Sequence, residues 1–382
     1  MKKISCIDSS TLEINNLSLN GLVGDRSLRD YTNEFKNSEY YFLDTRSKKV
    51  LDLGASYGDF AHWCFQHDAH SVISVEANPH VYKFLSRNTY LLMLEKNYLA
   101  LNFAISRNNY ERFVFKTHGT GAGSLKSHSK LKRGFKNRRV KKIKGYNAFL
   151  LVNLYKPDII KMDIEGEEYN ALEDISSYID EHRPELAIEY HYGFSKIEEI
   201  FSKLDYKVNI LEKNGSVGLI HCIPNEKSNS SHENIKNSSS QNFFDDNDKS
   251  FEKSKTRINV NSNSNSLIFS VRQWDNTDLT INCIESILDS AENQQTSVLL
   301  FDDCSKDIYE LVRLFSHFCD DERVFFFRSQ SRLEFVESYN LCADISTYKG
   351  FDFMYYVNND THSFSKGIDV KTIELFDDPK LG

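Results

Sequence analysis

The sequence lacks the apolar runs that membrane insertion and secretion require. A membrane-spanning helix needs about 20 consecutive apolar residues, and no run in the 382 residues approaches that length. The start, MKKISCIDSSTLEINN, has two lysines but no apolar core behind them, so it does not resemble a secretory signal. We therefore expect no transmembrane segment and a cytoplasmic protein.

Paired cysteines and an excess of positive charge are also missing. The seven cysteines are odd in number and show neither CxxC pairs nor a zinc-ligand spacing, so we expect buried or free thiols. A formal net charge of -8 gives no overall attraction to nucleic acid or to anionic membranes. Nucleic acid is therefore not an expected partner of the protein as a whole.

One segment, residues 225–266, is dominated by Asn, Ser and Lys and has almost no apolar periodicity. Such a composition cannot bury enough surface to offset the entropy of ordering, so it predicts a disordered linker. The length of the chain also exceeds what one core usually organises. We expect an N-terminal extension (1–48), a first domain (49–224) and a second domain (267–382), with residues 1–224 able to fold alone.

In the first domain, apolar runs of strand length alternate with amphipathic stretches of helical spacing. Pro79 suits the first turn of one of these helices. This alternation predicts an α/β fold with a seven-stranded, mostly parallel, doubly wound sheet. The predicted strands are 49–53, 71–75, 99–105, 157–162, 184–190, 206–211 and 217–223, with helices at 59–67 and 79–95.

The second domain repeats this alternation on a smaller scale, which predicts another α/β fold of the nucleotide-binding type. No internal repeat relates the two halves. The predicted strands are 267–271, 297–301, 324–327 and 353–357, with helices at 278–291 and 307–318.

A candidate cofactor site lies in VLDLGASYGDF, residues 50–60, where a buried strand runs into a turn and then a helix. Gly54 and Gly58 let the backbone approach a ligand closely, and two glycines four apart favour S-adenosylmethionine over a dinucleotide, which prefers GxGxxG. Glu76 ends the next strand, where a carboxylate accepts the ribose hydroxyls. Asp52 would face the methionine end. Alternatively, the two glycines serve only tight strand-to-helix packing.

Three motifs stand in order along the first domain: DLGASYG at 52–58, VEANP at 75–79 and KMDIEGEE at 161–168. In these motifs the sequence resembles the FkbM family of methyltransferases, over residues 50–223. The resemblance implies a seven-stranded Rossmann-like methyltransferase fold and O-methylation of carbohydrate or secondary-metabolite hydroxyls. The candidate cofactor-binding residues are Asp52, Gly54, Ala55, Gly58, Glu76, Asn78, Asn102, Ala104 and Asp163.

Methyl transfer to a hydroxyl needs a proton acceptor, and candidates stand at the ends of the fourth and fifth strands. Asp163 and Glu165 are two residues apart, as are Glu189 and His191, so each pair faces one side of its strand. His191 titrates nearest neutrality and is our first choice of base, with Asp163 second. Alternatively, His191 is a hydrogen-bonded residue at a strand end. Asp163, Glu165 and His191 could also hold Mg²⁺, although the spacing does not demand it.

A basic stretch, KSHSKLKRGFKNRRVKKIK at 126–144, precedes the third motif. Clustered cations favour phosphate, so it could attract an anionic acceptor such as a nucleotide-linked or phosphorylated sugar. A solvated loop is the simpler alternative. RNA is a rival partner, but Phe135 is the one aromatic residue among these cations that could stack on a base.

The second domain has two acidic sites, at the end of LIFSVRQWDNTDLTINCIESILDSAENQQTSVLLFDD and within MYYVNNDTHSF. There it resembles the start of family-2-like glycosyltransferases of the GT-A fold. The resemblance implies nucleotide-sugar binding by Asp302 and Asp303, and Mg²⁺ or Mn²⁺ binding by Asp360. Asp360 is the single carboxylate of its motif, which predicts weak metal affinity. Alternatively, Asp302 and Asp360 merely end strands.

The chain stops at Gly382, before the acceptor half of that family, so we expect an incomplete glycosyltransferase module. The sequence as a whole predicts a sugar O-methyltransferase fused to this module in glycan biosynthesis. An RNA-modifying methyltransferase and a non-catalytic scaffold that binds nucleotides or nucleotide sugars are the alternatives.

Overall fold

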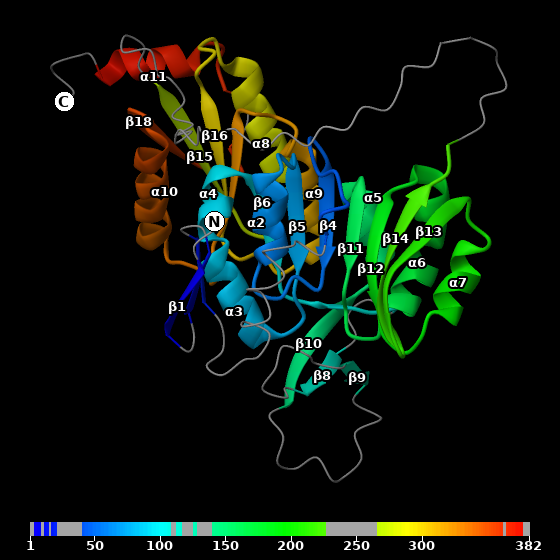
Figure 1. The fold of residues 1–382 in the computed structure, drawn as a ribbon. Coiled ribbons are helices and arrows are strands. Elements are labelled where there is room, and N and C mark those ends of the chain that lie inside the picture. The colour runs from blue at the N-terminus through cyan, green and yellow to red at the C-terminus, as the bar shows by residue number, and fades with distance from the viewer. Residues whose placement is uncertain are drawn as a thin grey trace, which may run out of the picture.

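The computed structural model describes residues 40–107, 143–226, 266–361 and 364–376 in full. It also describes the backbone of the strands at 4–8, 11–14, 17–20, 112–116, 125–127 and 140–142. These residues form a seven-stranded and a four-stranded sheet, each packed against helices, together with two small sheets (Figure 1). Most of the predicted linker lies outside the described residues.

The large sheet has the strand order β13-β14-β12-β11-β4-β5-β6. Its five central strands are parallel, and β14 and β13 add an antiparallel edge. Short apolar runs such as KVLDL and SVISV are buried almost completely, as expected for strands covered on both faces. The strands are β4 (Lys49–Leu53), β5 (Ser71–Val75), β6 (Asn97–Leu101), β11 (Ile159–Met162), β12 (Glu185–Tyr190), β13 (Tyr206–Asn214) and β14 (Val217–Pro224).

The predicted sheet is therefore confirmed, with two local corrections. The predicted strand 99–105 is two strands, because the chain leaves the large sheet after Leu101 and β7 (Ala104–Ile105) pairs with β10 (Val140–Tyr146) in a small sheet. The predicted helix 79–95 is also two helices. They meet at Thr89, which has non-helical backbone angles and donates its hydroxyl to the carbonyl of Leu85.

Six helices of the described chain accompany the large sheet. Asn78 caps one of them by accepting a hydrogen bond from the backbone N–H of His80, and Pro79 occupies the first helical position, as predicted. The helices are α2 (Asp59–Gln66), α3 (Pro79–Asn88), α4 (Tyr90–Glu95), α5 (Ala148–Tyr155), α6 (Glu168–His182) and α7 (Ser195–Phe201).

The second sheet is parallel, with the order β17-β16-β15-β18. Two helices that accompany it, α10 (Phe335–Lys349) and α11 (Ile368–Phe376), were not predicted. The buried face of α10 includes Ser338, Cys342 and Ser346, small residues that give almost no apolar periodicity. The predicted elements are β15 (Leu267–Gln273), β16 (Ser297–Asp302), β17 (Val324–Arg328), β18 (Phe353–Asn358), α8 (Thr277–Ser290) and α9 (Ile308–Phe318).

Two small sheets complete the described chain. One is antiparallel and lies within the predicted N-terminal extension: β1 (Ile4–Asp8), β2 (Thr11–Ile14) and β3 (Leu17–Asn20). In the other, β8 (Arg112–Lys116) joins β9 (Leu125–Ser127) and β10, so the two ends of the basic stretch are strands. The middle of that stretch lies outside the described residues.

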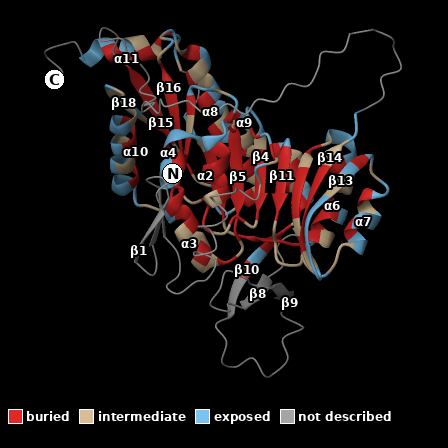
Figure 2. Cartoon of the chain, viewed as in Figure 1, coloured by how far each residue is buried: buried red, intermediate tan, exposed pale blue. Residues whose placement is uncertain are grey.

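The two α/β units share one hydrophobic core, and the prediction that residues 1–224 fold alone stays a prediction. Helix α5 packs against α9, and Tyr309 of α9 accepts a hydrogen bond from the backbone N–H of Asn147. Nearby, Asp320 binds both Lys49 and His70. Figure 2 shows buried residues along the strands of both sheets. The shared core includes Leu151, Val152 and Tyr155 from one unit and Leu311, Val312, Phe315 and Phe318 from the other.

None of the helices within the described ranges combines the length and the apolar character needed to cross a membrane.

Candidate functional site

The turn after β4 brings the first glycine motif against the end of β11. Gly54 and Gly58 have φ angles of 88° and 93°, in the left-handed region that favours glycine. A Cβ atom on Gly54 would overlap the carbonyl oxygen of Asp163. Gly54 is therefore required for the close approach of two strand ends, which is the packing role that the sequence left open.

Glu76 lies at the end of β5, beside this turn. Its Oε2 accepts the backbone N–H of Ser56 at 3.0 Å, and its Oε1 accepts that of Asn78 at 2.5 Å. Burial raises the pKa of Glu76 to about 7, although these two N–H groups favour the charged form. Each carboxylate oxygen can still accept another hydrogen bond. The Glu76 carboxylate is thus held in place and can still accept hydrogen bonds from a ligand.

The other cofactor candidates support this region from within. Ala55 and Ala104 are buried, and the side chain of Asn78 caps α3. Asn102 donates its amide to the carbonyl of Glu76 at 2.8 Å, which fixes the end of β5. In this arrangement Asn102 positions Glu76.

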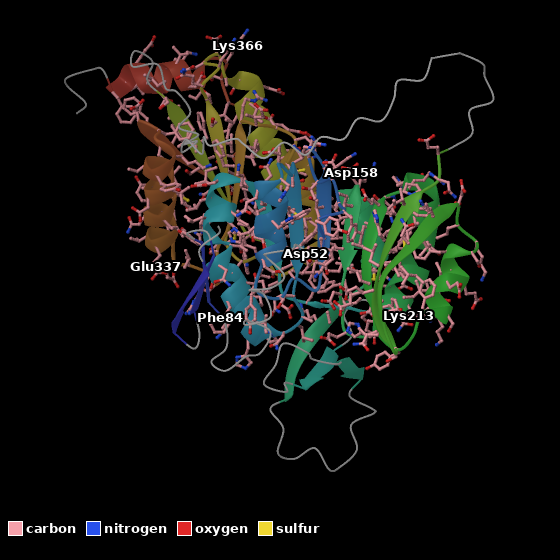
Figure 3. The ribbon with its side chains drawn as sticks, in the orientation of Figure 1. Asp52, Phe84, Asp158, Lys213, Glu337 and Lys366 are labelled. Atoms are coloured by element: carbon pink, nitrogen blue, oxygen red, sulfur yellow. The ribbon has the colours of Figure 1, made fainter. Side chains whose placement is uncertain are left out.

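Asp52 is completely buried, and Figure 3 labels it among the central strands. Lys161, its neighbour in register on β11, lies 3.3 Å from its Oδ1 and donates to the carbonyl of Gly54 at 2.7 Å. Burial alone would lower the pKa of Lys161, but the carboxylates of Asp52 and Asp163 raise it above its ordinary value. Asp52 is therefore one half of a buried ion pair behind the turn. Lys161 was not among the predicted site residues, and its signal in the sequence is a lysine within the buried strand IIKM.

The candidate catalytic residues come together where β11 and β12 end. His191 Nε2 lies 3.6 Å from Glu165 Oε2 and 3.9 Å from Glu189 Oε1. Asp163, Glu189 and His191 each offer one ligand atom, all within 4.8 Å of one another, so the cluster has the donor types to hold a cation. On the other side of the ring, His191 Nδ1 lies 3.0 Å from Glu168 Oε1. Glu168 was not among the predicted site residues, although it belongs to the third motif.

These carboxylates control the protonation of His191. Burial opposes the charged ring, but the hydrogen bond to Glu168 and the surrounding carboxylates raise the pKa of His191 to about 9. Burial also raises the pKa values of Asp163 and Glu165, against the favourable charge of His191. The cluster therefore holds an exchangeable proton and several acceptors in one small space, which is what proton transfer requires.

In the second unit, Asp302 and Asp303 are completely buried, and donors of the same unit bind both carboxylates. This is the arrangement expected of strand-end aspartates that stabilise their own unit. The donors are the side chains of Gln273, Ser305 and Arg328 for Asp302, and the side chain of Arg272 with the backbone N–H of Leu333 for Asp303.

Asp360 follows β18 and is exposed. Its neighbour Asn359 donates to the hydroxyl of Thr280 at 3.0 Å. Within the part of the chain that the structure describes, Asp360 belongs to no group of three metal-ligating side chains.

The parallel sheet, the glycine turn and the acidic end of β5 are the parts of an α/β methyltransferase domain. Residues 52–216 match the family model of the methyltransferase FkbM domain, which supports a methyltransferase function for this part of the chain. The family model ends at residue 216, so the glycosyltransferase resemblance of the second unit stays a prediction.

Among solved structures, the chain is similar to methyltransferase FkbM from Methylobacillus flagellatus KT, with 18% identity and a TM-score of 0.33. That match covers 46% of this chain and 43% of the other, so the chain spans less than half of that protein. It is also similar to the putative methyltransferase yhhF from Escherichia coli, with 12% identity, a TM-score of 0.33, and coverage of 58% and 99%. The structure of M. jannaschii TYW2 in complex with AdoMet matches with 13% identity, a TM-score of 0.31, and coverage of 58% and 84%. No curated protein matches the chain.

Proposed function

We propose that residues 49–224 bind S-adenosylmethionine and transfer its methyl group to a hydroxyl of a sugar or a similar small polar acceptor. The observation that carries this proposal is that the glycine turn, Glu76 and the His191 cluster all follow strands β4, β5, β11 and β12 at their carboxyl ends. In parallel α/β sheets, ligands bind along this edge. The donor supplies an already activated methyl group, so the protein has mainly to align the acceptor and remove its proton.

The residues around the glycine turn are suited to binding the methyl donor, S-adenosylmethionine. Glu76 is anchored through two backbone N–H groups and keeps lone pairs for the two ribose hydroxyls. Gly54 keeps the turn close to Asp163, and the Asp52–Lys161 pair fixes the strands beneath it. Glu76 would hold the ribose, and the turn from Gly54 to Gly58 would lie along the remainder of the cofactor.

The proposed site for the methyl acceptor is the His191 cluster, where the proton of the acceptor hydroxyl would be removed. A base with a pKa of about 9 is mostly protonated at neutral pH, but its neutral form is a stronger base than an ordinary histidine. His191 is therefore the proposed proton acceptor, with Asp163 as the second candidate. Methyl transfer should become faster as the pH rises towards 9.

The charge of this cluster bears on the acceptor class. The carboxylates of Asp163, Glu165, Glu168 and Glu189 surround His191. A polyanion would be repelled here, which favours a neutral sugar over RNA at the reacting end. An anionic or nucleotide-linked sugar would need cations for its phosphate, and the basic stretch 126–144 is the candidate that the sequence offers.

The experiment is calorimetric titration with S-adenosylmethionine, followed by mass spectrometry of a glycan pool incubated with the protein and an isotope-labelled donor. Glu76→Gln should weaken cofactor binding at least tenfold, consistent with the loss of about 1.5–3 kcal/mol from hydrogen bonds to a charged group. Glu173→Gln on α6 is the matched control and should bind normally. Equal affinity of the wild type and Glu76→Gln would contradict the donor assignment, and absence of label from every glycan would contradict the acceptor class.

The second unit is proposed as a partial glycosyltransferase module that serves glycan biosynthesis together with the methyltransferase domain. Because Asp302 and Asp303 are satisfied by neighbours in their own unit, nucleotide-sugar binding there would need those contacts to rearrange. A binding titration with a nucleoside diphosphate sugar, with and without Mn²⁺, tests this module and the scaffold alternative together, and Asp360→Ala is the control for the metal.

A further inference from the structure

Glu168 opens helix α6, yet its side chain is only 1% exposed. Its Oε1 lies within hydrogen-bond distance of three donors: the backbone N–H of Ile164 at 3.1 Å, that of Gly166 at 3.0 Å, and His191 Nδ1 at 3.0 Å. A buried carboxylate needs such partners. The two backbone N–H groups hold Glu168 in place without any contribution from His191.

This arrangement decides which ring nitrogen of His191 carries hydrogen. Glu168 Oε1 already accepts two backbone N–H groups, so it is an acceptor oxygen and Nδ1 of His191 donates to it. In the neutral ring the lone pair then lies on Nε2. Nε2 is the atom that faces Glu165 and Glu189, on the side of the cluster where the proposed acceptor would bind.

We propose that Glu168 is a positioning residue for methyl transfer, which holds Nδ1–H of His191 so that Nε2 takes the proton of the acceptor hydroxyl. This inference rests on the proposed function. In the step, the O–H bond of the acceptor breaks and the proton forms a bond with Nε2. The acceptor oxygen bonds to the methyl carbon while the S–CH₃ bond breaks and its electron pair stays on sulfur.

The effect of replacing Glu168 on the pKa and tautomer of His191 depends on the other carboxylates that face the ring. Asp163 and Glu165 follow β11, Glu189 lies on β12, and Glu168 lies on α6. Glu165 and Glu189 lie near Nε2 and favour a proton on that nitrogen. Glu168 accepts from Nδ1 and favours a proton there instead. Neutralising Glu168 should therefore lower the pKa of His191 and also shift the neutral ring towards the Nε2–H tautomer.

The first test is a pH titration of ¹⁵N-labelled histidine by NMR on the full chain, with the His191 signals assigned from His191→Asn. Glu168→Gln keeps the volume and an oxygen for the two backbone N–H groups. It should lower the pKa of His191 by about one unit or more, the size expected from removing a hydrogen-bonded charge. Glu167→Gln is the matched control, because the Glu167 carboxylate binds Asn170 instead. Unchanged pKa and tautomer in Glu168→Gln would overturn the proposal.

The second test follows methyl transfer against pH. Glu168→Gln should lower kcat about tenfold or more, with the KM for S-adenosylmethionine unchanged and the rising limb of the profile moved to lower pH. Glu168→Asp should restore part of the loss. A pH profile identical to that of the wild type would refute the positioning role. Absence of cofactor binding in the wild type would instead refute the proposed function, whatever the histidine spectra show.

Discussion

Replacing Lys161 by Met tests the buried ion pair that supports the glycine turn. Asp52 is completely buried, and Lys161 is the cation that neutralises it. Methionine keeps most of the length of the side chain but leaves the carboxylate without a counter-charge. Breaking such a pair costs about 3–5 kcal/mol, mostly because the remaining charge is buried and uncompensated. We expect a loss of this size in the free energy of unfolding at pH 7.

The pH dependence separates this cause from simple loss of packing. Without Lys161, the folded-state pKa of Asp52 rises further above the unfolded value of about 3.9. Protonation then relieves the penalty, so the deficit of Lys161→Met is small near pH 4 and grows as the pH rises towards the folded pKa. The double variant Asp52→Asn/Lys161→Met removes both charges and should recover most of the stability at pH 7.

Urea unfolding followed by circular dichroism from pH 4 to pH 8 measures these differences. The wild type, the single variant and the double variant should be compared at each pH. The reasoning is refuted if Lys161→Met loses less than about 1 kcal/mol at pH 7, or if its deficit is the same at every pH.

Three other changes test neighbouring parts of the molecule. Gly54→Ala should abolish cofactor binding or folding, because its Cβ would overlap Asp163; a soluble variant with normal calorimetric affinity would contradict this. Cofactor affinity should rise with pH through about 7, since ribose binding needs ionised Glu76, whose pKa lies there; calorimetry at pH 6 and pH 8 should show no such change in Glu76→Gln. Phe315→Ala should cost about 3–5 kcal/mol and lower the melting temperature of both units together, whereas two separate calorimetric transitions would show that the units unfold independently.

The central strands of the two larger sheets were predictable because most of them are short buried runs, such as β4 and β16. Thr89 was harder to interpret, since apolar residues continue on both sides of it and the change of helix direction depends on backbone angles. Helix α10 escaped prediction because its buried face is made largely of small polar residues. Periodicity detects an apolar face and fails where a helix packs closely through serine and cysteine.

The candidate site likewise contains residues that local sequence pattern predicts and residues that it does not. Gly54, Glu76 and His191 stand at strand ends and are visible from local pattern. Lys161 becomes meaningful only when the register places it beside Asp52. The shared core could not be predicted either, because the apolar face of α9 is clear in the sequence, whereas its partner α5 lies some 160 residues earlier.

The packing of α5 against α9 also constrains how this sequence can evolve. A substitution on the inner face of α9 changes the stability of the methyltransferase unit, even if the second unit binds nothing. Selection on the enzyme would therefore preserve the apolar residues of α9 and leave the exposed loops of the second unit free to drift. A second unit retained for this reason would keep its core long after losing any ligand of its own.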